Sequence, residues 1–409
     1  MKTFLILLML AALVGCGSKT ATSGDDASDN VADTSSDALD TSASGTDATA
    51  GATDATTAAP DADASADAAD TAASIHTYNG SVAAGDFITV TVDHAAGTVA
   101  WNNETTSLSG TSTFTEAADG SLVLGDDKGE FKTLYEIPGY ALVAQDQKAK
   151  DGTQKSLAFA FEKEAITKAD LANRTLNMMQ FKNRWGGVEI MCGTSDASGT
   201  LSTTSYMPAN TTGLYSEKSI PGSMFTEDAA KGVLKLTDPA KPGEDLTMFG
   251  TKSGLLGIDT PNGAVIGVNA AATPAFDPSV AGTYAMIGFE KQNEANGDYA
   301  PSDPYFGTAT FVQATFTLTA DGTLQNGGGK SGKLSPFKGS AFQGAGKVTQ
   351  DCNGLFVLDT GEGDAAFVGF QGNTLLFASF KMLTPATTGT GGVQIPATYK
   401  YTYGVALKK

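Results

Sequence analysis

Residues 87–99 decide the fold, and they read Phe87-Ile88-Thr89-Val90-Thr91-Val92-Asp93-His94-Ala95-Ala96-Gly97-Thr98-Val99. Apolar and polar residues alternate as far as Asp93, which is the pattern of a strand with one buried face. A short turn containing Gly97 follows, and glycine supplies the positive φ that tight hairpin turns require. The stretch therefore predicts an antiparallel β-hairpin.

The same pattern recurs at residues 188–201 and 314–324, where an alternating strand leads into a turn and then Gly-Thr-Leu. Because other apolar strands recur in the same order, we predict three modules, at 75–165, 168–272 and 277–409. Each would be a meander of short antiparallel strands, so the fold class is all-β, with small barrels or sandwiches. A β-propeller is the alternative, although its repeat would span only about 40–45 residues.

The N-terminus carries the features of a secretory signal. Lys2 precedes the apolar run 4–12, which is too short to cross a bilayer as a helix, and small residues follow. The stretch Leu13-Val14-Gly15-Cys16 resembles the lipobox of bacterial lipoproteins. That resemblance implies that residues 1–15 are a signal peptide and that Cys16 is lipidated. Since Gly17 and not Asp follows Cys16, it also implies a cell-envelope protein anchored at the outer membrane, in a cell that has one.

Residues 16–74 are predicted to form a disordered tether. From Gly17 onwards they consist mainly of Asp, Ala, Ser, Thr and Gly, with twelve Asp and no aromatic residue. Such a segment cannot bury enough apolar surface to offset the entropy of ordering. The whole chain has a formal net charge of −19 and no basic patch, which argues against nucleic acid as a partner.

Two cysteines remain besides Cys16, namely Cys192 and Cys352. In the oxidising compartment outside the cytoplasm they can form a disulfide. The sequence is equally compatible with a free reactive thiol or with two unrelated buried cysteines.

Calcium is the one cofactor that the sequence suggests. The loop 293–304 contains Asp298 and Asp303 among Asn, Glu, Gly and Pro, and calcium accepts such irregular sets of oxygen ligands. The same residue types also build ordinary turns. Neither His76 nor His94 has another His or a Cys at ligand spacing, so zinc is not expected.

No catalytic residue is predicted, because the chain lacks a Gly-x-Ser-x-Gly elbow and a histidine placed to activate a serine. Glu116 and Glu227 occupy matching positions in the first two modules. A pair of acids could cut glycosides, but a repeated structural turn would also repeat its acid.

Tyr399, Tyr401 and Tyr403 alternate along the last strand and therefore share a face. If exposed, that face would be a binding patch; otherwise it packs into a barrel or a neighbouring module. We therefore expect a lipid-anchored, non-catalytic envelope protein whose modules bind a protein or a glycan, or scaffold the surface. The alternatives are an extracellular hydrolase and a carrier of a small apolar ligand in a barrel cavity.

Overall fold

The computed structural model of the chain describes residues 74–409, with gaps at 84, 126–130, 147–155, 183–187, 207–214, 238–244, 262, 293–309, 339–351, 360–364, 385–386, 389–393 and 396–397. The predicted lipidation site Cys16, residues 16–73 of the predicted tether, and the calcium candidates Asp298 and Asp303 lie outside the described residues. Within the described ranges, no helix has the length and hydropathy needed to cross a bilayer.

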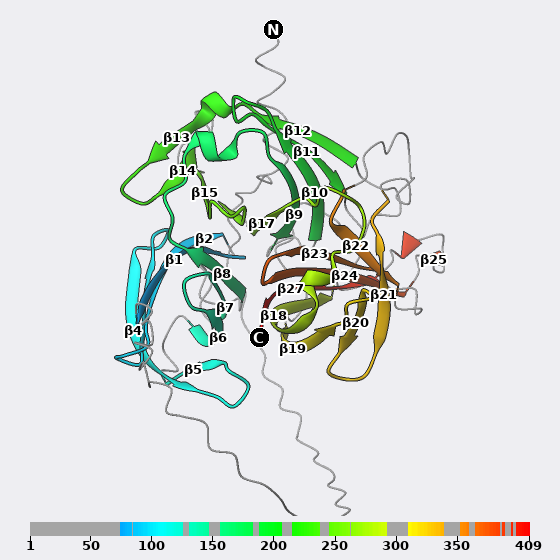
Figure 1. The fold of residues 1–409 in the computed structure, drawn as a ribbon, viewed down its shortest axis with the longest axis horizontal. Coiled ribbons are helices and arrows are strands. Elements are labelled where there is room, and N and C mark those ends of the chain that lie inside the picture. The colour runs from blue at the N-terminus through cyan, green and yellow to red at the C-terminus, as the bar shows by residue number, and fades with distance from the viewer. Residues whose placement is uncertain are drawn as a thin grey trace, which may run out of the picture. The chain divides into compact units, whose positions relative to one another are not determined.

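The first module is a closed barrel of eight antiparallel strands (Figure 1). Each strand pairs with the next, and β1 also pairs with β8 to close the barrel. The hairpin expected at residues 87–99 is β2 and β3, with Val92 opposite Val99 and Gly97 at a φ of 64°. The strands are β1 (Ile75–Val82), β2 (Asp86–Asp93), β3 (Thr98–Asn103), β4 (Leu108–Glu116), β5 (Leu122–Leu124), β6 (Phe131–Ile137), β7 (Ala141–Asp146) and β8 (Ser156–Glu162).

The second module is a nine-stranded antiparallel sheet that stays open between β12 and β13, although its first strand β9 pairs with its last strand β17. Pro221 and η2 lie between β12 and β13 in the chain. The elements are η1 (Lys168–Leu171), β9 (Thr175–Lys182), β10 (Val188–Ser195), β11 (Leu201–Tyr206), β12 (Tyr215–Ile220), η2 (Gly222–Met224), β13 (Phe225–Asp228), β14 (Val233–Leu236), β15 (Leu246–Gly250), β16 (Leu256–Thr260) and β17 (Gly263–Asn269).

The third module is again a closed barrel, formed by β18 to β24 and β27, with β25 and β26 as a separate two-stranded sheet. Its elements are η3 (Pro278–Val280), β18 (Gly282–Gln292), β19 (Thr310–Leu318), β20 (Thr323–Asn326), β21 (Ser331–Pro336), β22 (Leu355–Asp359), β23 (Ala365–Gln371), β24 (Thr374–Thr384), β25 (Thr387–Thr388), β26 (Gln394–Ile395) and β27 (Thr398–Lys408). The prediction of an all-β chain of antiparallel meander modules is confirmed. Two of the modules are closed barrels and not sandwiches or propeller blades.

Several strands are apolar on both faces. In β8, Leu157, Phe159 and Phe161 belong to a cluster outside the barrel, whereas Ala158 and Ala160 belong to the cluster inside it. A strand that is buried on both faces reads as a continuous apolar run, as residues 157–161 do. The outward-facing row of β8 is therefore available to pack against another module.

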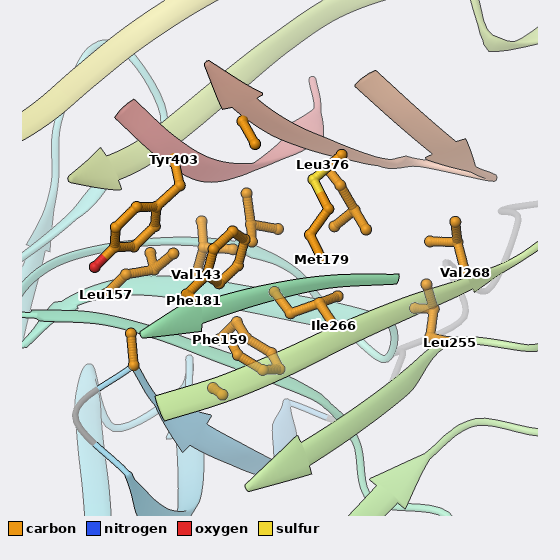
Figure 2. Packing of buried hydrophobic residues seen from close by; sticks show 14 of the residues in the cluster. Val143, Leu157, Phe159, Met179, Phe181, Leu255, Ile266, Val268, Leu376 and Tyr403 are labelled. Atoms are coloured by element: carbon orange, nitrogen blue, oxygen red, sulfur yellow. The ribbon is translucent and has the colours of Figure 1, made fainter. Parts of the chain in front are cut away.

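That outside cluster, which we call the shared core, takes residues from all three modules (Figure 2). Its residues labelled in Figure 2 are Val143, Leu157, Phe159, Met179, Phe181, Leu255, Ile266, Val268, Leu376 and Tyr403. Phe159 of the first module stacks on Phe249 of the second with 5.9 Å between ring centroids. Phe181 of the second stacks on Tyr403 of the third at 4.6 Å. The modules are thus joined by aromatic packing, and residues 73–409 form one compact unit.

Hydrogen bonds between modules surround this core. Ser81 Oγ of the first module donates to Asp259 Oδ1 of the second over 2.6 Å. Tyr140 OH of the first donates to the Gln371 carbonyl of the third over 3.0 Å. The Gln371 side chain in turn donates to the Ser253 carbonyl of the second over 2.5 Å. Every pair of modules is therefore also connected by polar contacts.

We expect Phe181→Ala to lower the free energy of unfolding by about 3–5 kcal/mol, because it empties space in a packed aromatic core. The chain has two tryptophans, so in a Trp185→Phe background the fluorescence reports on Trp101 of the first module. Because the core is shared, this change in the second module should shift the guanidinium midpoint seen by Trp101.

The matched control is Tyr403→Phe, which removes a buried hydroxyl that has no hydrogen-bond partner. Its free energy of unfolding should stay within about 0.5 kcal/mol of the parent value, since no hydrogen bond is lost. An unchanged Trp101 midpoint in Phe181→Ala would show that the modules do not depend on one core.

Candidate binding site at the mouth of the first barrel

Both histidines of the chain lie at one end of the first barrel. Tyr78 on β1 and Val92 on β2 belong to the interior cluster of this barrel. His76 lies two residues before Tyr78 and His94 two residues after Val92, so each continues an inward-facing row. Because β1 and β2 are antiparallel, both rows reach the same end of the barrel.

Three glutamates occupy equivalent positions at this end. Strands β2, β4, β6 and β8 run in the same direction, so their last residues lie at one end of the barrel. Glu116 ends β4, Glu136 is the penultimate residue of β6, and Glu162 ends β8. Each lies two residues beyond a residue of the interior cluster or one packed against it. We call His76, Tyr78, His94, Glu136 and Glu162 the mouth cluster.

Glu136 is fixed by the fold. Tyr78 OH donates to Glu136 Oε1 over 2.5 Å, and His94 Nε2 lies 2.9 Å from Glu136 Oε2. The Glu136 side chain is only 2% exposed. Burial, and then the bond to Glu136, raise the pKa of Tyr78, which therefore remains a neutral donor. Both carboxylate oxygens of Glu136 are thus occupied.

Glu162 differs from Glu136 because it keeps an unused oxygen. Its Oε1 lies 3.8 Å from His76 Nδ1, whereas its Oε2 is buried and has no hydrogen-bond partner. Burial raises the pKa of Glu162, the nearby Glu136 raises it further, and His76 opposes the shift. A buried acceptor without a partner costs free energy. Glu162 is therefore the acceptor in the mouth cluster with capacity for a further donor.

The mouth cluster does not form a metal centre. Across the described residues, no group of three or more His, Cys, Asp or Glu side chains is arranged to hold a metal ion. The calcium candidates Asp298 and Asp303 fall in a gap and stay a prediction.

Cys192 of β10 and Cys352, just before β22, are joined as a disulfide with 5.8 Å between their Cα atoms. This spacing lies within the usual range for disulfides. Both cysteines belong to the shared core, so the bond ties the second module to the third.

Of the two interpretations of the tyrosine row on the last strand, the exposed binding patch is wrong for Tyr401 and Tyr403, and the packed one holds. They are only 5% and 1% exposed, and Tyr403 belongs to the shared core. The face packs against Phe181 of the neighbouring module, because a tyrosine ring is stabilised by burial against another aromatic ring. Tyr399 pairs with Met382 in the sheet, and its side chain lies outside the described part.

The matching acids Glu116 and Glu227 have different surroundings. Glu116 lies at the mouth of the first barrel, whereas Glu227 lies on β13 of the second module. Glu227 Oε1 accepts a hydrogen bond of 2.9 Å from the Lys168 backbone N–H in η1. Glu227 therefore has the role of a structural turn acid.

The comparisons with known proteins are as follows. No family model and no curated protein matches the chain. Among solved structures, it is similar to a double mutant of transferrin binding protein B from Haemophilus parasuis Hp5. That similarity has 10% identity and a TM-score of 0.23, over 82% of this chain and 76% of the other. A protein of unknown function from Nostoc punctiforme is similar at 10% identity and a TM-score of 0.15, over 60% of this chain and 100% of the other. At these TM-scores, the similarities carry no argument about function.

The sequence reasoning missed the mouth cluster because it judged His76 and His94 only by their distance along the chain. The signal that could have found it is the alternation of side chains along each strand: an inward-facing row of residues ends on a titratable residue. Such rows end on His76, His94, Glu116, Glu136 and Glu162. Once a closed barrel is known, those row ends meet at one mouth.

We expect alkylation of the denatured, unreduced chain carrying Cys16→Ser to find no free thiol, and two after reduction. Because the bond closes a separation of 160 residues, Cys192→Ala should lower stability by about 3–5 kcal/mol in urea titrations. Finding two free thiols before reduction would contradict the pairing.

We expect Glu162→Gln to raise the thermal midpoint near neutral pH. The raised pKa of Glu162 means that the fold favours the protonated carboxyl. That stability is present below the unfolded pKa and is lost as the pH rises through the folded pKa. Glutamine mimics the protonated form, so the gain should vanish in acid. Calorimetric scans across pH would check this, and a variant less stable than the parent at neutral pH would contradict it.

Proposed function

We propose that the chain is a lipid-anchored protein of the cell envelope, held at the outer membrane where the cell has one. Its three β modules would act together as one rigid, non-catalytic body that binds a protein or a glycan. The shared core is the observation that carries this proposal. Modules that share a core keep fixed orientations, so surfaces on different modules can meet one large partner together.

The non-catalytic part of the proposal rests on how the acids are used. Glu136 has both oxygens occupied by Tyr78 and His94. Glu227 accepts a backbone hydrogen bond in a different module from Glu116. A glycosidase needs two acids about 5–10 Å apart across one substrate bond. The pair suggested by the sequence, Glu116 and Glu227, is divided between two modules, and Glu227 already accepts a backbone hydrogen bond.

The carrier alternative has no observation in its favour. The interior cluster of the first barrel includes large side chains of its own strands, among them the fully buried Tyr78 and Phe131. In the third barrel, Tyr284 is fully buried and Phe316 stacks on Phe377 at 5.4 Å. Large side chains buried in this way stabilise the barrels themselves.

We expect Cys16→Ser to release the protein from the membrane, because the lipid would be attached to this thiol. Metabolic labelling with palmitate and membrane fractionation would measure it: the parent chain should be labelled and sediment with membranes, and the variant should do neither. Cys192→Ser is the matched control and should leave the anchor intact. A Cys16→Ser chain that stays with the membrane would contradict the proposed anchoring.

A further inference from the structure

We propose that the mouth of the first barrel binds a primary ammonium group, with Glu162 as its counter-ion. The inference rests on the proposed binding function and gives it one ligand chemistry. The group could be carried by a small amine or by a lysine side chain of a partner. In both cases the same N–H donors would meet the same carboxylate.

Glu162 is the carboxylate at the mouth that can accept a further hydrogen bond. Its Oε2 is buried and unpartnered, while its side chain as a whole is 28% exposed, so solvent reaches this side chain through atoms other than Oε2. Glu136 cannot take this role, because Tyr78 and His94 occupy its oxygens. The ligand would approach the solvent-exposed side of this carboxylate, where the protein offers only His76 Nδ1 at 3.8 Å from Oε1.

A second polar group beneath the mouth also lacks a partner. Ser112 is 4% exposed, and its Oγ makes no hydrogen bond. It lies on the same face of β4 as Phe114 and Glu116, two residues further into the barrel than Phe114. The inward row of β4 thus carries an exposed acid at the rim and an unpartnered hydroxyl below it.

The mouth also offers an apolar side for the carbon atoms next to an ammonium group. Phe114 is partly buried against the interior cluster, and its ring meets the ring of His94 edge-on at 5.8 Å between centroids. Alkyl ammonium groups combine an apolar stem with a charged head. The stem would lie against Phe114 while the head reaches Glu162.

The chemistry favours an ammonium over other cations. A guanidinium is planar and binds carboxylates best through two parallel bonds, whereas Oε1 of Glu162 already faces His76 Nδ1 at 3.8 Å and Oε2 is buried. An ammonium is compact and has rotatable donors, so one acceptor can orient it. A metal ion is less suitable, because no metal-binding group of three or more such residues occurs in the described ranges.

The negative net charge of the chain also favours a positively charged ligand. The formal net charge of the chain is −19 at neutral pH. Negative charge raises the local concentration of cations and speeds their encounter with a site.

The test compares the parent chain with Glu162→Gln by thermal unfolding at neutral pH. The probes are propylammonium chloride and the blocked peptide acetyl-Gly-Lys-Gly-amide. Their controls at equal ionic strength are tetramethylammonium chloride, which has no N–H donor, and the same peptide with its lysine acetylated. The matched charge control is Glu290→Gln, which removes a surface ion pair with Lys400 in the third module.

We expect at least one ammonium probe to raise the midpoint of the parent and of Glu290→Gln by about 1–3 °C at saturation. Glu162→Gln should not respond, although it is itself more stable near neutral pH. Response to propylammonium alone would identify a small amine, and response to the peptide a lysine side chain.

The proposal would be overturned if neither ammonium probe acts on the parent, or if Glu162→Gln responds equally. It would also be overturned if tetramethylammonium acts as strongly as propylammonium. If the parent chain still sediments with membranes, such results would reject the ammonium site and leave the proposed anchoring intact.

Discussion

The structure depends on strands that are apolar on both faces. In an ordinary antiparallel barrel one face of each strand is buried and the other meets water. Here the rows of Phe159 and Tyr403 face outwards from their barrels and still lie in a core. Barrels with such rows would expose large apolar surfaces if they stood apart, and this would favour association. Packing them around a common core removes these surfaces from water.

This arrangement also accounts for where the chemistry lies. The outward-facing apolar rows pack between modules, and the inward-facing rows form the barrel interiors. Polar groups therefore lie where the inward-facing rows end. At the mouth of the first barrel these ends are His94, Glu136 and Glu162. The 3.8 Å contact between His76 on β1 and Glu162 on β8 follows from the closure of β1 on β8, which brings the first and last strands together. Residues far apart in the sequence thereby form one site.

The sequence was enough to predict the all-β class and the antiparallel meanders, because alternation and Gly-containing turns are local signals. It could not reveal that the second module stays open, since that depends on the pairing between strands far apart in the sequence. It also could not reveal whether Tyr403 faces water or a core. An alternating row of tyrosines has the same sequence pattern whether it is exposed or buried. The contact with Phe181 of the neighbouring module shows that Tyr403 is buried. The ends of the inward rows could have been read, but only on the assumption of a closed barrel.

The central claim is that the three modules are stabilised by one core and therefore unfold together. Differential scanning calorimetry of the full chain tests this most directly. The account predicts a single transition in which the calorimetric and van't Hoff enthalpies agree, with a ratio of about 1. Two or three separate transitions, or a calorimetric enthalpy about two or three times the van't Hoff value, would contradict it.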